Sequence, residues 1–417
     1  MHPLVKPALR RGWRDLNTVQ FGMTPAHALI LGPMDTATGS FLDLLDGARG
    51  LELLRTEGHR MDLPDGQVDT LVERLSRAGL VDDARGGGPA AQELREKKEV
   101  LDRLGPDLAS LSLITQEPGG AIGRLAARRA LRVEVRGAGR VGVTLAALLS
   151  GAGVGEVDVR DVGRVQPWDV APGGLSAESV GERRAEAARA VVRRAAPDRP
   201  PRRPAPDAPE PGLALVVIAP RDDVLVHAPD ARAAEPLMAS GTPHLYTGVV
   251  EGTGVVGPLV LPGGTGCARC LHEHRTDRDP AWPRLVAQWR SGRARRVGAC
   301  DLTLAAAVAG LAAAHALAFL DGESPSGTGV RWEASVPALH WHPRPVPPHP
   351  ACPCGAPEKT EPAAERKGDE TAGEKAEGEQ ASTYGTSHGT MVVQRPSATR
   401  RKAADAARPN GTWRAHV

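Results

Sequence analysis

The stretch LRVEVRGAGRVGVTLAALLSGAG, residues 131–153, constrains the fold of this chain more than any other. A strand-like apolar pattern runs into Gly137, Gly139 and Gly142, and an apolar helical pattern follows at once. In this setting G-x-G-x-x-G predicts a tight turn, a close approach of phosphate to the backbone, and a helix packed closely on the strand. Asp161 ends the next predicted strand, where a carboxylate can accept hydrogen bonds from ribose hydroxyls. We predict a nucleotide-type site here; the alternative is a glycine-rich turn without a ligand.

The pattern of alternating strands and helices continues around this turn and predicts an α/β body. Further strands are expected at GEVDVRD (155–161) and LALVVIAP (213–220), with a proline-rich connection, 197–211, before the latter. The segments HLYTGVVEG (244–252) and VVGPLVLPG (255–263) predict two more strands, which we expect to be antiparallel.

The first part of the chain predicts a small α+β unit of the winged-helix type. TVQFGM and HALILG are strand-like, and three helical patches follow. In the third patch Val68, Leu71, Val72 and Leu75 recur at helical spacing, and Gly79 is expected to cap that helix. A helix is also expected around ELREKKEVLDRL (93–104). The predicted organisation is a recognition module at 1–84, a linker at 85–104, the α/β body at 105–356 and a disordered tail at 357–417, which lacks apolar periodicity.

Charge and composition indicate which kinds of partner, among nucleic acids, peptides and membranes, this chain could bind. The formal net charge of +2 argues against a protein that coats nucleic acid. Residues 1–84 hold nine Lys/Arg and twelve Asp/Glu, so the module suits a peptide, added as an edge strand, better than DNA. The apolar stretch 302–320 is mostly alanine and contains His315, which favours a buried helix over a membrane span. The start of the sequence lacks a signal-peptide pattern, and we expect a cytoplasmic protein.

Four cysteines form two close pairs in the sequence. C-x-x-C and C-x-C provide the ligands for a tetrathiolate zinc site if the fold brings the pairs together. The alternatives are His272 or His274 in place of one thiolate, or reduced thiols without metal. A fifth cysteine, Cys300, precedes a predicted helix, whose N-terminus would lower its pKa; we favour a lone buried cysteine over such a reactive thiol. The four paired residues are Cys267, Cys270, Cys352 and Cys354.

The body resembles the ThiF and MoeB adenylyltransferases and the ubiquitin-activating enzymes over roughly residues 105–355. The resemblance is carried by GRLAARRALRVEVRGAGRVG (123–142), VGERRAEAARAVVRRAAP (180–197), LVVIAPRDD (215–223) and the two cysteine pairs. It implies a Rossmann-like ThiF-type fold that uses ATP and magnesium to transfer AMP to the C-terminal carboxylate of a peptide or of a ubiquitin-like or sulfur-carrier protein. It further implies a structural zinc and a homodimer.

The same resemblance assigns roles to individual residues. Asp222 or Asp223 would be the metal-proximal catalytic carboxylate, and Arg184 stands where the family has lysine. The implied cofactor-binding set is Gly137, Gly139, Gly142, Asp161 and Arg184. Two family arginines are missing, from SLSLITQ (110–116) and VAPGGLS (170–176). Candidates to replace them are Arg136, Arg140 and Arg164.

Residues 2–54 resemble the peptide-recognition element fused to ThiF-like proteins in the biosynthesis of thiazole- and oxazole-modified peptides. That resemblance implies binding of a precursor's leader peptide, a decayed ATP site and a separate YcaO-type enzyme as partner. Two functions therefore stay open: adenylylation of a carboxylate, or leader-peptide binding by a catalytically degenerate subunit. A nicotinamide-dependent dehydrogenase would share the glycine turn but explains neither the cysteine pairs nor the first module.

Overall fold

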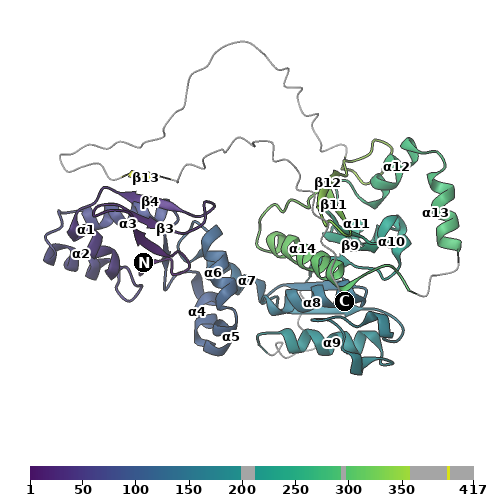
Figure 1. The fold of residues 1–417 in the computed structure, drawn as a ribbon, viewed down its shortest axis with the longest axis horizontal. Coiled ribbons are helices and arrows are strands. Elements are labelled where there is room, and N and C mark those ends of the chain that lie inside the picture. Colours follow the sequence, from purple (N-terminus) through teal and green to yellow (C-terminus); the bar gives the residue numbers. More distant parts are fainter. Residues whose placement is uncertain (199–211, 293–296, 357–391, 395–417) are drawn as a thin grey trace, which may run out of the picture. The chain divides into compact units, whose positions relative to one another are not determined.

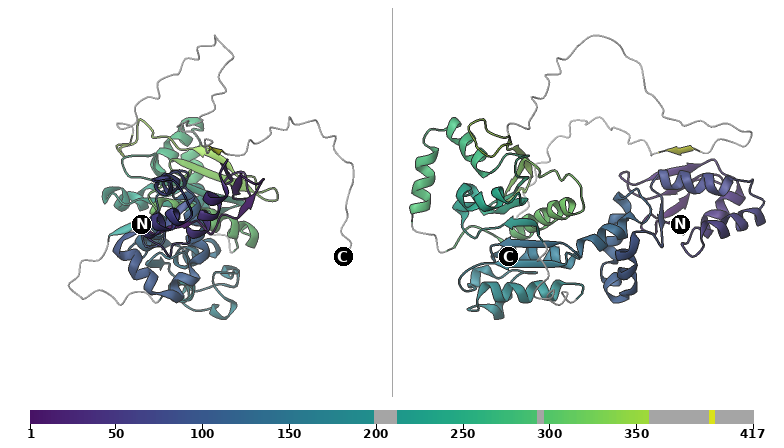
Figure 2. Two further views of the ribbon diagram at one scale, coloured as in Figure 1. Left: turned by 90° about the vertical axis from the view of Figure 1, so that its left-hand side faces the viewer. Right: turned by 180° about the vertical axis from the view of Figure 1, so that it is seen from behind.

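The computed structural model describes residues 1–198, 212–292, 297–356 and 392–394 (Figure 1, Figure 2). The described residues form two compact units. The smaller contains residues 1–86 and 109–120 together with Val392–Gln394, and the larger contains residues 87–108 and the described residues from Ala121 to Ala356. The predicted disordered tail, 357–417, lies outside the described residues except for this short segment.

A seven-stranded mixed sheet forms the centre of the larger unit. Its strands are β6 (Arg132–Arg136), β7 (Glu156–Arg160), β8 (Leu213–Ile218), β9 (His244–Val250), β10 (Thr253–Val260), β11 (Val330–Ser335) and β12 (His342–Pro345). The order is β12-β11-β10-β9-β8-β6-β7. Strands β7, β6, β8 and β9 are parallel to one another, whereas β9 to β12 are antiparallel. The predicted α/β body and the predicted antiparallel pair β9–β10 are confirmed.

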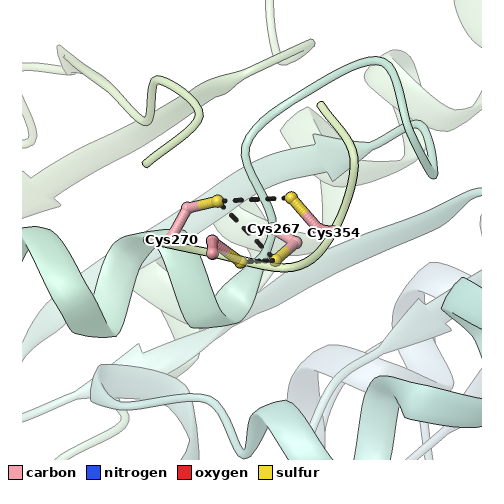
Figure 3. A group of neighbouring side chains, drawn as sticks. Cys267, Cys270 and Cys354 are labelled. Atoms are coloured by element: carbon pink, nitrogen blue, oxygen red, sulfur yellow. Dashed lines mark hydrogen bonds between the residues drawn. The ribbon is translucent and has the colours of Figure 1, made fainter. Parts of the chain in front are cut away.

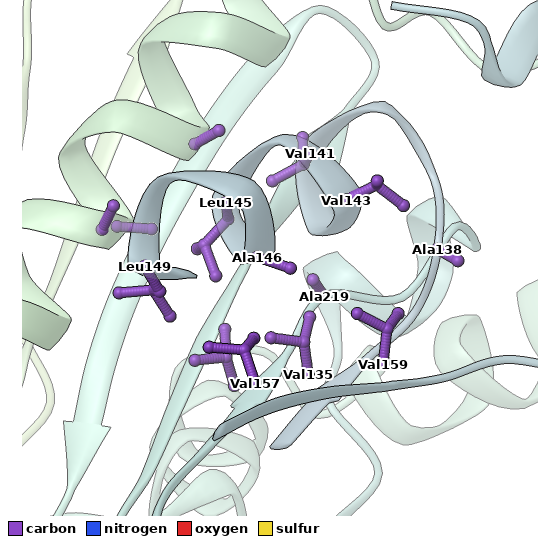
Figure 4. Close-up of a cluster of buried hydrophobic side chains, with 14 of the residues drawn as sticks. Val135, Ala138, Val141, Val143, Leu145, Ala146, Leu149, Val157, Val159 and Ala219 are labelled. Carbon is purple, nitrogen blue, oxygen red and sulfur yellow. The ribbon is translucent and has the colours of Figure 1, made fainter. Parts of the chain in front are cut away.

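Helices flank this sheet. They are α7 (Gly120–Arg128), α8 (Arg140–Gly151), α9 (Arg184–Ala195), α10 (Asp223–His227), α11 (Ala231–Ala239), α12 (Ala268–Arg278), α13 (Trp282–Ser291) and α14 (Leu302–Leu320), with 3₁₀ turns η2 (Pro167–Asp169) and η3 (Ala177–Ser179). Helix α8 packs between α9 and α14. Figure 4 shows Leu145 and Leu149 of α8 over Val135 of β6 and Val157 of β7, all in one buried cluster. This packing fixes the start of α8 beside the ends of β6 and β7.

Helix α14 is the apolar stretch noted in the sequence. By length and composition it passes the test for a membrane span, the one described helix that does so. Its buried residues, among them Leu304, Val308 and Ala312, belong to the same core cluster as α8. The expectation of a helix packed in the core is confirmed.

The segment predicted as a linker is largely helical. It forms α4 (Gly88–Glu96) and α5 (Lys98–Arg103), and α6 (Gly105–Ile114) follows. The single helix expected over 93–104 was wrong, because Lys97 at φ −89°, ψ 69° leaves the helical region and separates α4 from α5.

The smaller unit contains two sheets. One pairs β1 (Pro3–Val5) with β5 (Val81–Asp83), and the other has the order β13-β4-β3-β2. Its further elements are β2 (Arg11–Trp13), β3 (Val19–Phe21), β4 (Leu29–Gly32), α1 (Thr36–Phe41), the 3₁₀ turn η1 (Leu42–Leu44), α2 (Leu51–Arg60), α3 (Gln67–Arg77) and β13 (Val392–Gln394). The two strands predicted from TVQFGM and HALILG are β3 and β4.

Helix α3 ends as its sequence predicts. Gly79 lies just past the C-cap with φ +71°, the left-handed region that favours glycine. The Leu80 amide donates to the Leu75 carbonyl and the Gly79 amide to the Ser76 carbonyl, which satisfies the free carbonyls of the last turn. The apolar face predicted for α3, which includes Leu71 and Leu75, is buried in the core of the smaller unit.

Candidate functional site

The glycine turn lies between β6 and α8, as the sequence predicts, and two of its glycines are required by backbone packing. Gly137 has φ +121°, and a Cβ there would lie 1.9 Å from the carbonyl oxygen of Ala219. A Cβ on Gly142 would lie 2.0 Å from the carbonyl oxygen of Gly137. Helix α8 begins at Arg140 with Gly139 as N-cap and without a side-chain cap. The amides of its first turn therefore remain available to an anion.

Asp161 and Arg184 are brought to this turn, but they bind each other. Asp161 Oδ1 accepts a hydrogen bond of 2.9 Å from Arg184 Nε, and Oδ2 accepts one of 2.6 Å from the amide of Ala138. Arg184 also donates to the carbonyls of Arg164, at 2.6 Å, and of Val162. The two side chains are only 9% and 10% exposed. The predicted ribose acceptor and the predicted phosphate-side cation thus hold the turn in place.

A second ion pair crosses the turn, and the sequence analysis missed it. Asp169 of η2, 3% exposed, accepts hydrogen bonds from Arg221 Nε at 2.9 Å and Nη2 at 2.6 Å. The stem of Arg221 lies against Gly139, where an added Cβ would be 2.9 Å from its Cγ. Arg221 therefore occupies the space next to the glycine that should let a phosphate approach. In the sequence, Arg221 was visible as the arginine of APRDD, directly before the predicted catalytic residues Asp222 and Asp223.

The two predicted catalytic carboxylates have different roles in the structure. Asp222 caps α10: its Oδ1 accepts from the amides of Val224 at 2.8 Å and Leu225 at 3.3 Å. Asp223 lines the cavities beside the turn. Asp222 lines the larger of these cavities as well, whereas Asp223 lines both.

Two cavities meet at this site. The larger, about 1230 Å³, extends from Gly137 to α10 and α13, and the smaller, about 500 Å³, surrounds the start of α8. The larger exceeds the roughly 300–1,000 Å³ of ordinary small-molecule pockets. Within the part of the chain that the structure describes, Arg189 of α9 lines it without a hydrogen-bond or ion-pair partner. Arg189 is a cation that the sequence analysis did not single out.

The three arginines proposed as replacements bind protein groups. Arg136 pairs with buried Glu134 at 2.7 Å, and Arg164 donates to the carbonyl of Gly181 at 2.7 Å. Arg140 donates to the carbonyl of Cys300 at 2.7 Å. Burial raises the pKa of the Cys300 thiol, and the residue packs partly into the core. Both observations agree with the favoured interpretation of a lone buried cysteine.

An aromatic group forms the far wall of the larger cavity. The His227 ring meets Trp282 at 5.5 Å and Trp289 at 5.9 Å between centroids, both edge to face. The Arg275 guanidinium carbon lies 4.7 Å from the Trp282 ring centroid. Burial and then the charge of Arg275 lower the pKa of His227 to about 4. His227 is therefore neutral at pH 7, and of these rings His227 and Trp289 line the cavity.

The four paired cysteines come together at the start of α12 and in the loop after β12 (Figure 3). The sulfur of Cys267 lies 3.8 Å from that of Cys270 and 3.7 Å from that of Cys352, and Cys270 lies 3.6 Å from Cys354. Tetrahedral zinc with Zn–S bonds of about 2.3 Å places its sulfurs about 3.8 Å apart. The cluster could hold such an ion. The hydrogen bond that Cys267 donates lowers the pKa of the Cys270 thiol, which favours its thiolate form.

The histidines considered as alternative ligands bind elsewhere. His272 Nδ1 accepts from Trp282 Nε1 at 3.1 Å, and His274 Nε2 lies 3.2 Å from the carbonyl of Pro347. A neighbouring contact supports the cysteine loop instead. His349 Nε2 lies 2.8 Å from Asp277 Oδ2 on α12, and its carbonyl accepts from the amide of Cys352.

Comparison with known proteins identifies the lineage of the larger unit. The model of the ThiF family matches residues 113–354. No curated protein sequence matches the chain. Among solved structures, E. coli MccB with ATP has a TM-score of 0.59 at 14% identity, over 85% of this chain and 99% of that chain. The microcin C7 biosynthetic enzyme MccB in complex with N-formylated MccA gives a TM-score of 0.59 at 14% identity, over 85% and 100%. Selenomethionine PaaA gives 0.57 at 14%, over 82% and 100%. At these identities the likeness concerns the fold alone.

Proposed function

The chain belongs to the ThiF family, and on that premise we propose that it binds the leader segment of a precursor peptide without cleaving ATP. It would present the peptide to a separate YcaO-type enzyme that carries out the cyclodehydration. The proposal includes a homodimer, as the family resemblance implies. The peptide would bind the smaller unit, whose acidic charge balance and small antiparallel sheet suit an extended chain.

The pairing of Asp161 with Arg184 is the observation that carries this proposal. The two groups that ought to meet the ribose and the phosphates satisfy each other at 2.9 Å and lie almost out of solvent. A nucleotide would have to compete with a hydrogen-bonded pair of opposite charges in a partly desolvated site. The missing family arginines and the position of Arg221 against Gly139 support the same reading.

The solved relatives support a role with peptides. MccB has been crystallised with N-formylated MccA, and also with AMPCPP and MccA. A chain of the same fold that lacks residues for the binding of ATP would still be able to bind a peptide. The four cysteines, in this proposal, hold one structural zinc that fastens α12 to the loop after β12.

Adenylylation remains the second candidate function, because Asp223 and Arg189 line the same cavity as Gly137. In that reaction a peptide carboxylate oxygen attacks the α-phosphorus of ATP. The new P–O bond yields an acyl adenylate, and the bond to the departing pyrophosphate breaks. Arg189 would offset charge on the phosphates, and Asp223 would hold magnesium.

Pyrophosphate exchange distinguishes the two functions. Full-length protein is incubated with magnesium, ATP, labelled pyrophosphate and the precursor peptides encoded near its gene, and peptide binding is measured separately by fluorescence anisotropy. We expect binding without label entering ATP. Label that enters ATP with the wild type, and no longer does so with Asp223→Asn, would establish adenylylation and refute our proposal. A failure of every precursor to bind would refute the peptide role.

A further inference from the structure

The outer edge of β4 is paired with a segment from the far end of the same chain. In β13, Val392 lies opposite Gly32, Val393 opposite Leu31 and Gln394 opposite Ile30, all antiparallel. Figure 1 shows β13 along the outer side of β4, where it is the fourth strand of the β2–β3–β4 sheet. Without it, β4 would expose a row of unpaired backbone donors and acceptors, which is a template for another strand. The edge can therefore accept a strand, and the chain supplies one.

The amino-acid sequence of the tail fits this role at one place. Met391, Val392 and Val393 form the longest run of large apolar residues within 357–417, which is otherwise rich in Glu, Lys, Ala, Gly and Arg. β-Branched residues favour strands, whereas the surrounding residue types do not. The sequence analysis treated the whole tail as one disordered segment and overlooked this run.

A three-residue strand binds weakly on its own, but here it is tethered. Residues 357–391 connect it to Ala356 at the end of the larger unit. A chain of that length with random-coil statistics would have an r.m.s. end-to-end distance of about 30–35 Å. Tethers of this kind give an effective concentration on the order of 1 mM. A segment whose intrinsic dissociation constant is about 0.1 mM would then occupy the edge about nine-tenths of the time.

We propose that Val392–Gln394 is a built-in occupant of the strand-addition site on β4, and that an extended peptide must displace it in order to bind. The inference rests on the proposed function in one respect: the displacing ligand is the precursor peptide. A strand that replaces β13 in the same register can make the backbone hydrogen bonds that β13 makes to the segment Ile30–Gly32, so the exchange leaves no group of this edge unpaired. With the occupancy above, the tail would raise the apparent dissociation constant of a competing peptide about tenfold.

The test removes the ability of the segment to pair while keeping the full chain. In the double variant Val392→Pro/Val393→Pro, two consecutive residues lose the backbone N–H, so pairing fails whichever of them donates to β4. Ser382→Pro is the matched control, because it places a proline in the tail outside the strand. The probe is a fluorescent synthetic peptide of residues 386–398, and amide hydrogen exchange is followed in β4.

We expect the probe to bind the double variant at least fivefold more tightly than it binds the wild type or Ser382→Pro. Exchange at the β4 amides should be faster in the double variant and slow again when the probe is added. Equal affinities for all three proteins, or unchanged exchange in β4, would overturn the inference. Protection of β4 that depends on protein concentration would assign the strand to a second copy and would overturn the intramolecular form.

A second ligand separates this inference from the proposed function. The leader segment of a candidate precursor is titrated against the probe on the double variant. Competition supports both proposals. If the probe binds with the expected preference but no leader competes, the tail is the occupant and the peptide-delivery function is refuted. If leaders bind the wild type and the double variant equally, the delivery function survives and the inference fails.

Discussion

Asp161 and Arg184 form a hydrogen-bonded ion pair at the turn between β6 and α8, with 2.9 Å between Oδ1 and Nε. Each side chain has a further partner in the backbone: the amide of Ala138 for Asp161, and the carbonyls of Val162 and Arg164 for Arg184. The pair therefore joins the ends of three elements, β7, α9 and the glycine turn. Both charges of the pair are thus satisfied within the protein.

The first prediction concerns the stability that this pair provides. Asp161→Asn removes the nearer counter-charge of the buried Arg184 guanidinium, which keeps only Asp169 at 3.7 Å, and removal of one partner of a buried pair typically costs about 3–5 kcal/mol. We expect the free energy of unfolding, from urea denaturation followed by circular dichroism, to fall by about 3 kcal/mol. The control is Glu73→Gln in the exposed pair with Arg77, where side chains are 68% and 71% exposed. It should change stability by less than about 0.5 kcal/mol. Equal effects of the two substitutions would show that the Asp161 pair has no structural role.

The second prediction separates the three glycines of the turn. Gly137→Ala and Gly142→Ala each place a Cβ about 2 Å from a backbone oxygen, which no side-chain movement can relieve. Overpacking of this kind costs about 1–3 kcal/mol or more, and the positive φ of Gly137 adds strain. Gly139→Ala meets the side chain of Arg221 and no backbone atom at such a distance, so a shift of that stem can relieve the contact, and the φ of −90° suits any residue.

We therefore expect Gly137→Ala and Gly142→Ala to unfold at clearly lower urea concentration than the wild type, or to accumulate poorly. Gly139→Ala should lose less than about 1 kcal/mol. Thermal and urea denaturation of the three single variants provide the measurement. A loss for Gly139→Ala as large as for the other two would contradict the packing account of this turn.

The parts of the fold that the sequence predicts correctly are mostly those that depend on local patterns of residues. The glycine turn, the strand β6 and the face of α3 depend on residues within a few positions of one another, so their periodicity is visible in the sequence. The cysteine pairs were also recognisable, because C-x-x-C restricts what a short segment can do. Their approach across about 80 residues was a prediction that the geometry confirms.

The rest depends on contacts between distant segments, which no local pattern reveals. Arg221 meets Asp169 only because the turn after β8 comes to lie beside η2, and β13 pairs with β4 from the other end of the chain. The ligand roles of Asp222 and Asp223 stay predictions, although the structure gives Asp222 a capping role.

The third prediction concerns zinc. Wild-type protein purified under reducing conditions should contain about one zinc per chain, as a tetrathiolate site holds one ion. Cys270→Ser removes one of the central sulfurs, which is within 3.8 Å of Cys267 and 3.6 Å of Cys354, and should abolish stoichiometric zinc. Cys300→Ser, which changes a thiol outside the cluster, should keep it.

The measurement is metal analysis by mass spectrometry together with thermal denaturation before and after chelation. Removal of zinc should lower the melting temperature of the wild type and of Cys300→Ser, but not that of Cys270→Ser, which has no ion to lose. Wild-type protein that contains no zinc and melts at the same temperature with added zinc would establish the reduced-thiol alternative.

The last prediction follows from the pKa of His227. In the folded protein burial lowers this pKa from 6.5 to about 4, whereas the unfolded chain protonates the residue near its ordinary value. Between these values the unfolded state binds more protons, so stability is full above about pH 6.5 and is lost as the pH falls toward 4. Because His227 is partly open to solvent, we expect less than the full effect of this pKa shift, a loss of about 1–2 kcal/mol in the free energy of unfolding across this window.

His227→Gln should remove that part of the acid sensitivity and leave the remainder. His59→Gln, at a site where the side chain is 62% exposed, should behave as the wild type does. Urea denaturation at pH 7 and pH 5 gives the comparison, and equal pH dependence in the wild type and His227→Gln would show that the aromatic wall does not hold this histidine neutral.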